Sequence, residues 1–341
     1  MALTPNSRFA LGVNGLSIHY LEAGDPGGPC VLLLHGFPEL AYSWRKVMPA
    51  LADAGYYVVA PDQRGYGATT GWDVRDLRSF SLGNLARDAV DLLKGRKAHL
   101  VGHDFGSFVA GAAALLYPDA FRSVTFMSAP WGGVGARPTN PDPELAALGR
   151  KHYQWYYSTP HADRDMHDSA QGLHAFLRAY YHVKSADWPD NRPHPLREWS
   201  AAELAKLPRY YIMDLDRDMA ETVAPHMPAQ AAPWLTDEEL AVYVRAFEHT
   251  TFQGGLNWYR CATEGLSAAS LGKGRALEMP AQYIAGAADW GIYQNPGAFE
   301  RMQTSAVCAD WRGAHLVEGA GHWVQQEKPE RVSALLLDFL L

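Results

Sequence analysis

Cysteine is scarce in this chain, and the chain has no long apolar segment. Its 341 residues include three cysteines, which are far apart and form no CxxC pair. The sequence therefore predicts neither a disulfide framework nor a structural zinc site. No apolar stretch is long enough to cross a bilayer, and the first residues lack the apolar run of a signal peptide. We expect a cytoplasmic protein that does not insert into membranes.

Basic residues are also in deficit, which argues against one class of partner. The 30 Lys and Arg residues are outnumbered by 37 Asp and Glu residues, and the formal net charge is −7. Proteins that bind nucleic acid usually present a basic face, so we expect no nucleic-acid partner. The hydrophobic share of 48% supplies enough material for a large core. We expect a globular protein that is a monomer or a homodimer.

Short apolar runs alternate with helical patterns over the first third of the chain. Residues 30–34 form a continuous apolar run that predicts a strand buried on both faces, and residues 98–101 predict another short strand. Residues 85–93 carry an apolar stripe at helical spacing, and residues 105–116 also predict a helix. This alternation is typical of an α/β fold with a mostly parallel central sheet and helices on both faces.

The alternation of strands and helices stops near residue 133. Beyond that point, stretches rich in Trp, Tyr and His are separated by prolines, and the earlier rhythm resumes at residues 281–284. We therefore predict one α/β core made of residues 1–133 and 270–341. Residues 134–269 are predicted to form a helical cap, or lid, inserted into that core.

Residues 100–107 carry the strongest chemical signal, a short strand that runs through a tight turn into a helix. A nucleophile elbow needs small residues on both sides of its strained apex, and Gly102 and Gly106 flank Asp104 in this way. Backbone N–H groups and the helix dipole would favour the carboxylate there. No G-x-S-x-G occurs in the chain. We interpret Asp104 as the nucleophile; the alternative is an ordinary strand–helix turn in which Asp104 caps the helix.

Three other segments fall where a nucleophile of this kind needs support. The segment after the first buried strand contains Phe37, whose N–H could form an oxyanion hole together with the N–H of Phe105. Asp289 follows a late strand and suits an acid that orients a histidine. His322 precedes the last helix and suits a general base. The order nucleophile, acid, histidine is that of the α/β-hydrolase fold.

Together these segments resemble the epoxide hydrolase branch of the α/β-hydrolases over nearly the whole chain. The resemblance implies two cap tyrosines that hydrogen-bond the oxirane oxygen. One is Tyr259, in a segment Leu-Asn-Trp-Tyr-Arg that is similar to the family's motif. The other lies in residues 153–160, Tyr-Gln-Trp-Tyr-Tyr-Ser-Thr-Pro, where we choose Tyr156 and keep Tyr157 as the alternative.

The resemblance also implies the reaction and its partners. A small-molecule epoxide and water would yield a vicinal diol through an alkyl ester on Asp104, with no metal or organic cofactor. His322 and Asp289 would activate the water that hydrolyses this ester. Further side chains are expected to line the substrate pocket, namely Trp155, Tyr157, Pro38 and Trp323.

The nearest alternative is a dehalogenase of the same fold, which also uses an aspartate nucleophile. Haloalkane dehalogenases commonly bind the halide with a Trp after the nucleophile and with an Asn in the first oxyanion segment. Phe105 and Phe37 stand at these positions, and neither side chain can donate a hydrogen bond. A haloacetate dehalogenase is disfavoured because Phe105 and Phe108 offer no arginine for a substrate carboxylate. An ester hydrolase or a binding protein on this fold remains a weaker alternative.

Overall fold

The computed structural model describes residues 5–134, 139–267, 271 and 274–340. Its main feature is an eight-stranded sheet in the order β1-β2-β4-β3-β5-β6-β9-β10. The strands are β1 (Asn6–Val13), β2 (Leu16–Ala23), β3 (Cys30–Leu34), β4 (Tyr57–Pro61), β5 (Ala98–His103), β6 (Phe121–Met127), β9 (Leu277–Gly286) and β10 (Cys308–Val317).

Only one edge of the sheet is antiparallel. Strand β1 pairs with β2, and β2 with β4, in antiparallel register, whereas every pairing from β4 through β10 is parallel. The predicted mostly parallel α/β sheet is confirmed. Because parallel strands end at the same edge, the loops after β3, β5, β6, β9 and β10 meet there.

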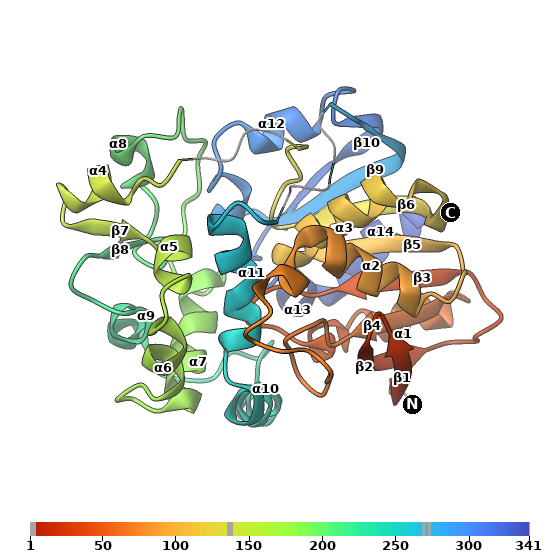
Figure 1. Ribbon diagram of the computed structural model, residues 1–341, viewed down its shortest axis with the longest axis horizontal. Coiled ribbons are helices and arrows are strands. Elements are labelled where there is room, and N and C mark those ends of the chain that lie inside the picture. The colour runs from red at the N-terminus through yellow and green to blue at the C-terminus, as the bar shows by residue number, and fades with distance from the viewer. Residues whose placement is uncertain (1–4, 135–138, 268–270, 272–273, 341) are drawn as a thin grey trace.

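Helices cover both faces of the sheet (Figure 1). Strand β3 shows why: Leu32 and Leu34 join one apolar cluster, and Val31 and Leu33 join another on the opposite face. The first cluster includes the buried sides of α2 and α3, and the second those of α1 and α14. The helices are α1 (Met48–Asp53), α2 (Leu82–Leu92), α3 (Phe105–Leu116), α12 (Ala298–Met302), α13 (Val324–Glu327) and α14 (Pro329–Leu340). Short 3-10 helices are η1 (Ala41–Trp44), η2 (Leu77–Phe80), η3 (Pro118–Ala120), η4 (Ala224–His226) and η5 (Trp290–Ile292).

The segment between β6 and β9 is mostly helical and lies beside the carboxyl ends of the strands (Figure 1). It contains α4 (Asp142–Ala146), β7 (Arg150–His152), α5 (Tyr153–Tyr157), α6 (Ala162–His167), α7 (Leu173–Lys184), α8 (Ala201–Leu204), β8 (Ile212–Asp214), α9 (Met219–Val223), α10 (Asp237–Thr250) and α11 (Gln253–Thr263). Strands β7 and β8 pair only with each other, a feature that the sequence did not predict. The predicted cap boundaries fall at or next to residues 135–138 and 268–270, outside the described residues.

Within the part of the chain that the structure describes, every helix is too short or too polar to span a lipid bilayer.

Candidate active site

Asp104 occupies the sharp turn between β5 and α3. Its backbone angles are φ 53° and ψ −121°, a conformation that is strained for any residue with a side chain. The turn is crowded, because a Cβ atom on Gly102 would collide with the carbonyl of Gly106, and one on Gly106 with the carbonyl of Leu34. The glycines on both sides therefore allow the turn to close and present the Asp104 carboxylate above the sheet edge.

The Asp104 carboxylate has two partners. Oδ1 accepts a hydrogen bond of 3.0 Å from the N–H of Phe37, and Oδ2 lies 3.4 Å from Nε2 of His322. Burial opposes ionisation, but the nearby imidazole of His322 outweighs it and holds the pKa of Asp104 well below its ordinary value. Phe105 opens α3 directly after Asp104. The loop and the helix thus place both predicted oxyanion segments beside a carboxylate.

His322 lies between two carboxylates. Its Nδ1 is 3.1 Å from Oδ1 of Asp289, on the loop after β9, while its Nε2 faces Asp104. Burial and the charge of Lys184 lower the pKa of His322, but Asp289 and Asp104 raise it to about 9 overall. Asp289 is held in turn by the N–H of Gly291, which donates to Oδ1 at 2.7 Å. This arrangement can orient the imidazole and direct Nε2 at the elbow.

Ser128 also belongs to this group, although the sequence analysis did not predict it. It follows β6 with φ 66°, and its Oγ donates to Oδ2 of Asp289. The same Oγ lies 3.3 Å from Nδ1 of His322 and 3.1 Å from its carbonyl oxygen. The only available signal was its position directly after a buried strand that neighbours β5.

A second buried chain of contacts supports His322 from behind. His103 Nε2 lies 2.7 Å from the carbonyl of His322, and His103 Nδ1 lies 2.6 Å from Glu39 Oε2. The amides of Gln325 and Gln326 donate to the other Glu39 oxygen, each at 3.1 Å. Burial raises the pKa of Glu39, but the charge of His103 reverses this and lowers it overall. The group ties the loops after β3 and β5 to the loop that carries the histidine.

A cavity of about 530 Å³ opens above Asp104. Tyr153 and Tyr259 line it together with the nucleophile, and Gln294 and Arg301 add polar groups to its wall. Most of the remaining wall is aromatic or apolar: Leu82, Phe105, Phe108, Trp131, Val134, Trp155, Trp199 and Leu271. Such a space suits a largely apolar small molecule.

The two tyrosines of this cavity come from different helices. Tyr259, on α11, packs edge-on against Phe37 and Phe105 with ring centroids 5.5 and 5.2 Å away. Tyr153 opens α5, and its hydroxyl donates to Oε1 of Gln294 at 2.9 Å. The two tyrosine ring centroids are 5.9 Å apart. Burial, reinforced by the charge of Asp104, raises both pKa values well above the ordinary value, so both phenols stay protonated.

The prediction that Tyr156 faces the nucleophile is wrong. Its hydroxyl donates to Asp165 at 3.2 Å and accepts from the N–H of Met219 at 3.5 Å, away from the cavity. Tyr153, at the start of the same short helix, holds the place expected of Tyr156. The pairing of β7 with β8 fixes where α5 begins, because the N–H of Tyr153 donates to the carbonyl of Tyr211 at 2.9 Å.

The other pocket candidates divide between the cavity wall and the protein interior. Trp155 lines the cavity. Tyr157 packs its ring on Phe37 and Tyr259 and donates its hydroxyl to Tyr180 at 3.1 Å. Trp323 is fully buried against His322, and Pro38 accepts a hydrogen bond from Tyr181. Tyr157, Trp323 and Pro38 therefore support the site without lining its cavity.

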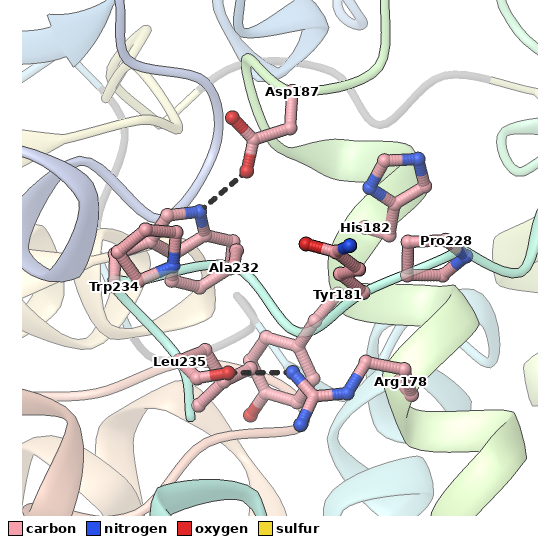
Figure 2. A pocket seen from close by; sticks show the side chains of 10 residues that line it. Arg178, Tyr181, His182, Asp187, Pro228, Ala232, Trp234 and Leu235 are labelled. Atoms are coloured by element: carbon pink, nitrogen blue, oxygen red, sulfur yellow. Dashed lines mark hydrogen bonds between the residues drawn. The ribbon is translucent and has the colours of Figure 1, made fainter. Parts of the chain in front are cut away.

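A smaller cavity of about 200 Å³ lies between α7 and the segment 228–235 (Figure 2). Four of its lining residues are already joined by hydrogen bonds: Arg178 donates to the carbonyl of Leu235, and the indole of Trp234 donates to Asp187. Asp104 is not among its lining residues. The cavity above Asp104 is therefore the candidate active site.

An aspartate at a strained strand–helix turn, faced by a histidine and a second aspartate, defines this protein as an α/β-hydrolase. Residues 29–192 match the family described as alpha/beta hydrolase fold. The chain is 35% identical to epoxide hydrolase A of Mycobacterium tuberculosis, covering 98% of this chain and 97% of that protein. It is 34% identical to epoxide hydrolase B of the same organism, over 97% of both chains.

Solved structures agree with the sequence relatives. Epoxide hydrolase A from Mycobacterium thermoresistibile superposes with a TM-score of 0.81 at 34% identity, over 99% of this chain and 98% of that one. A mutant of potato epoxide hydrolase gives a TM-score of 0.77 at 28% identity, over 98% and 99% of the two chains. The chain belongs to the epoxide hydrolase family.

Proposed function

We propose that this protein hydrolyses an epoxide to a vicinal diol through an alkyl ester on Asp104. One observation carries the proposal: a buried, ionised aspartate forms the floor of a cavity whose wall holds two protonated tyrosines. An epoxide needs both groups, because its carbon is electrophilic and its ring oxygen gains negative charge as the ring opens. Membership in the family supports this substrate class.

In the first step, an oxygen of Asp104 bonds to one ring carbon and the bond from that carbon to the ring oxygen breaks. Tyr153 and Tyr259 donate hydrogen bonds to the departing oxygen, and one of them supplies its proton. The hydroxyl of Tyr153 turns from Gln294 to the substrate for this purpose. Tyr153 thus takes the role that the sequence assigned to Tyr156.

In the second step, water attacks the carbonyl carbon of the Asp104 ester. His322 accepts the water's proton at Nε2, and Asp289 and Ser128 hold the ring in place from the Nδ1 side. The negative charge that develops on the ester oxygen is stabilised by the N–H of Phe37, which already contacts Oδ1 of Asp104, and by the N–H of Phe105. When this adduct collapses, the bond from Cγ to the alkyl oxygen breaks, and that oxygen takes the proton back from His322 and leaves as the diol. The second proton of the water, left on Asp104, returns to the tyrosine phenolate, which restores both the carboxylate and the phenol.

We also propose that residues 134–269 act as the lid of the site. Helix α5 carries Tyr153 and α11 carries Tyr259, and both helices lie in this segment. Asp104, which attacks the epoxide carbon, belongs to the core, whereas the tyrosines that stabilise the epoxide oxygen belong to the lid. Ring opening therefore requires the core and the lid to be packed together. The contacts of Tyr259 with Phe37 and Phe105 provide that packing.

A parallel panel of epoxides and haloalkanes tests the proposed function. We expect diol from at least one epoxide with a largely apolar body, and no halide from the haloalkanes. The Asp104→Ala variant is the control and should form no diol. Halide release without diol formation would overturn the assignment and indicate a dehalogenase. Diol formation that survives in the Asp104→Ala variant would overturn the mechanism.

A further inference from the structure

Lys184, the last residue of α7, has a buried ammonium surrounded by aromatic rings. The residue is 4% exposed, and its Nζ donates to the hydroxyl of Tyr180 at 3.5 Å. Nζ also lies 4.9 Å from the ring centroid of Tyr211, 5.7 Å from that of Tyr210 and 5.8 Å from that of Trp323. Aromatic faces attract a cation, but a buried charge without an anionic partner is still costly.

No carboxylate forms an ion pair with Lys184 among the described residues. The lysine therefore differs from buried charges elsewhere in the chain, such as Arg64, which pairs with Asp88 at 2.7 Å. Neither the packing of α7 nor the hydrogen bond to Tyr180 requires a positive charge. We therefore looked for a role of the Lys184 charge in the candidate active site around His322.

Lys184 is joined to the catalytic histidine in two ways. Its carbonyl oxygen accepts a hydrogen bond of 2.8 Å from the N–H of His322. The ring of Trp323 packs against the imidazole of His322, with centroids 4.6 Å apart, and also faces the ammonium. The charge of Lys184 acts on both reacting groups, since it lowers the pKa of His322 together with burial and, after His322, helps lower that of Asp104.

Other titratable groups lie around His322. Asp104 faces Nε2, Asp289 faces Nδ1, and His103 contacts the carbonyl, with Glu39 behind it. Glu327, on α13, accepts the N–H of Trp323 at 3.0 Å, and burial raises its pKa to about 7. Among these neighbours, the Lys184 ammonium acts against a positive charge on His322, whereas the Asp289 and Asp104 carboxylates favour one.

The balance of these charges changes during the proposed reaction. In the resting enzyme the Asp104 carboxylate favours protonated His322. Ester formation neutralises Asp104, which leaves His322 between the Asp289 carboxylate and the Lys184 ammonium. A positive neighbour disfavours a second positive charge. Loss of one carboxylate in the continued presence of a cation therefore favours the neutral imidazole at the moment when a base is needed.

We propose that Lys184 is a positioning residue that keeps His322 neutral, and so able to accept a proton from water, once Asp104 carries the alkyl group. The inference rests on the proposed function. In the step concerned, water transfers a proton to Nε2 of His322 and its oxygen bonds to Cγ of Asp104. The bond from Cγ to the alkyl oxygen then breaks, and that oxygen takes the proton back from His322.

The test measures the decay of the alkyl-enzyme ester against pH in single turnovers. The variants are Lys184→Met, which removes the charge, and Lys184→Arg, which keeps it. Exposed Lys97→Met, at the opposite end of β5 from Asp104, is the matched control. Glu327 is present in all of these proteins, so its titration does not distinguish them.

The rate of ester decay should rise with pH as His322 loses its proton, and we call this part of the pH profile the acid limb. In Lys184→Met we expect the acid limb to shift upward by roughly one pH unit, the size of shift that a nearby charge commonly produces. Decay on that limb would then be about tenfold slower, with the high-pH plateau and ester formation retained. Lys184→Arg and Lys97→Met should keep the original limb. Lys184→Gln serves as the uncharged variant if Lys184→Met does not fold, as judged by thermal unfolding.

If a folded uncharged variant and the unaltered enzyme have the same acid limb, the proposal for Lys184 is overturned, while the proposed function still stands. The same result with a lowered unfolding temperature would assign Lys184 a purely structural role. If the unaltered enzyme opens no epoxide and forms no ester, the proposed function itself fails. Failure of the Lys184 proposal is therefore seen in the variants, and failure of the proposed function is seen in the unaltered enzyme.

Discussion

Replacing Tyr153 with Phe is the sharpest single test of the oxygen-stabilising pair. The substitution removes the hydroxyl that faces the cavity and leaves the ring, which packs against Tyr157 and Tyr211 with centroids 5.3 and 5.1 Å away. The α5 packing should therefore survive. The expected loss is confined to ring opening, because only that step places negative charge on the epoxide oxygen.

The magnitude follows from the number of donors. Removing one preorganised donor from a developing oxyanion slows a reaction by roughly a hundredfold, equal to about 3 kcal/mol. Tyr259 would remain as the second donor, so activity should fall to a measurable level and not to zero. The Tyr153→Phe, Tyr259→Phe double variant should approach complete loss. Stopped-flow measurement of ester formation, with kcat/KM from diol production, gives both values.

Tyr156→Phe is the matched control from the same helix. Its hydroxyl contacts Asp165 and the N–H of Met219, so the variant loses about 1 kcal/mol of stability at most and keeps its rate of ring opening. If Tyr156→Phe slowed ester formation a hundredfold and Tyr153→Phe did not, the placement of α5 over the cavity would be refuted.

Three further outcomes are expected. His322→Gln should still form the ester but hydrolyse it slowly, so mass spectrometry should detect protein heavier by one substrate; an unmodified mass after exposure to a turned-over epoxide would contradict the role of His322 as base. Gly106→Ala should fail to fold or lose several kcal/mol, as measured by urea unfolding, because its Cβ would collide with the carbonyl of Leu34; a fully stable variant would refute the argument from crowding. The pKa of His322 is raised to about 9 in the folded state. Its ion pairing therefore stabilises the fold by up to roughly 3 kcal/mol below pH 6.5, and this stabilisation is lost as the pH rises through about 9. Urea unfolding of the unaltered enzyme and His322→Gln should therefore differ most near pH 6 and converge above pH 10, and a pH-independent difference would contradict the ion pairing.

Local patterns in the sequence were sufficient for the parallel sheet and the elbow. The strand at 30–34 and the turn around Asp104 could be predicted from the sequence, because burial on both faces and crowding at a turn each depend on a few neighbouring residues. Asp289 and His322 could also be proposed, since each lies at an expected place after a strand or before a helix. The structure brings both to the elbow that carries Asp104.

Contacts between distant segments could not be predicted in this way. Tyr153 and Tyr156 lie three residues apart in an aromatic stretch, and the choice between them depends on the rotation of α5 above the sheet. That rotation is set by the short pairing of β7 with β8, which are about 60 residues apart. No local sequence pattern predicted this pairing. Ser128 and His103 were missed for the same reason, because their partners come from other loops.

The central claim is that Asp104 is a nucleophile and not a general base. A single turnover in heavy-oxygen water tests it directly, with the enzyme in excess over the epoxide and mass spectrometry of both the diol and the peptide that contains Asp104. Our account predicts that heavy oxygen enters the Asp104 carboxylate and that the diol formed in that turnover is largely unlabelled. Heavy oxygen in the diol, with none in Asp104, would show direct attack by water and contradict the account.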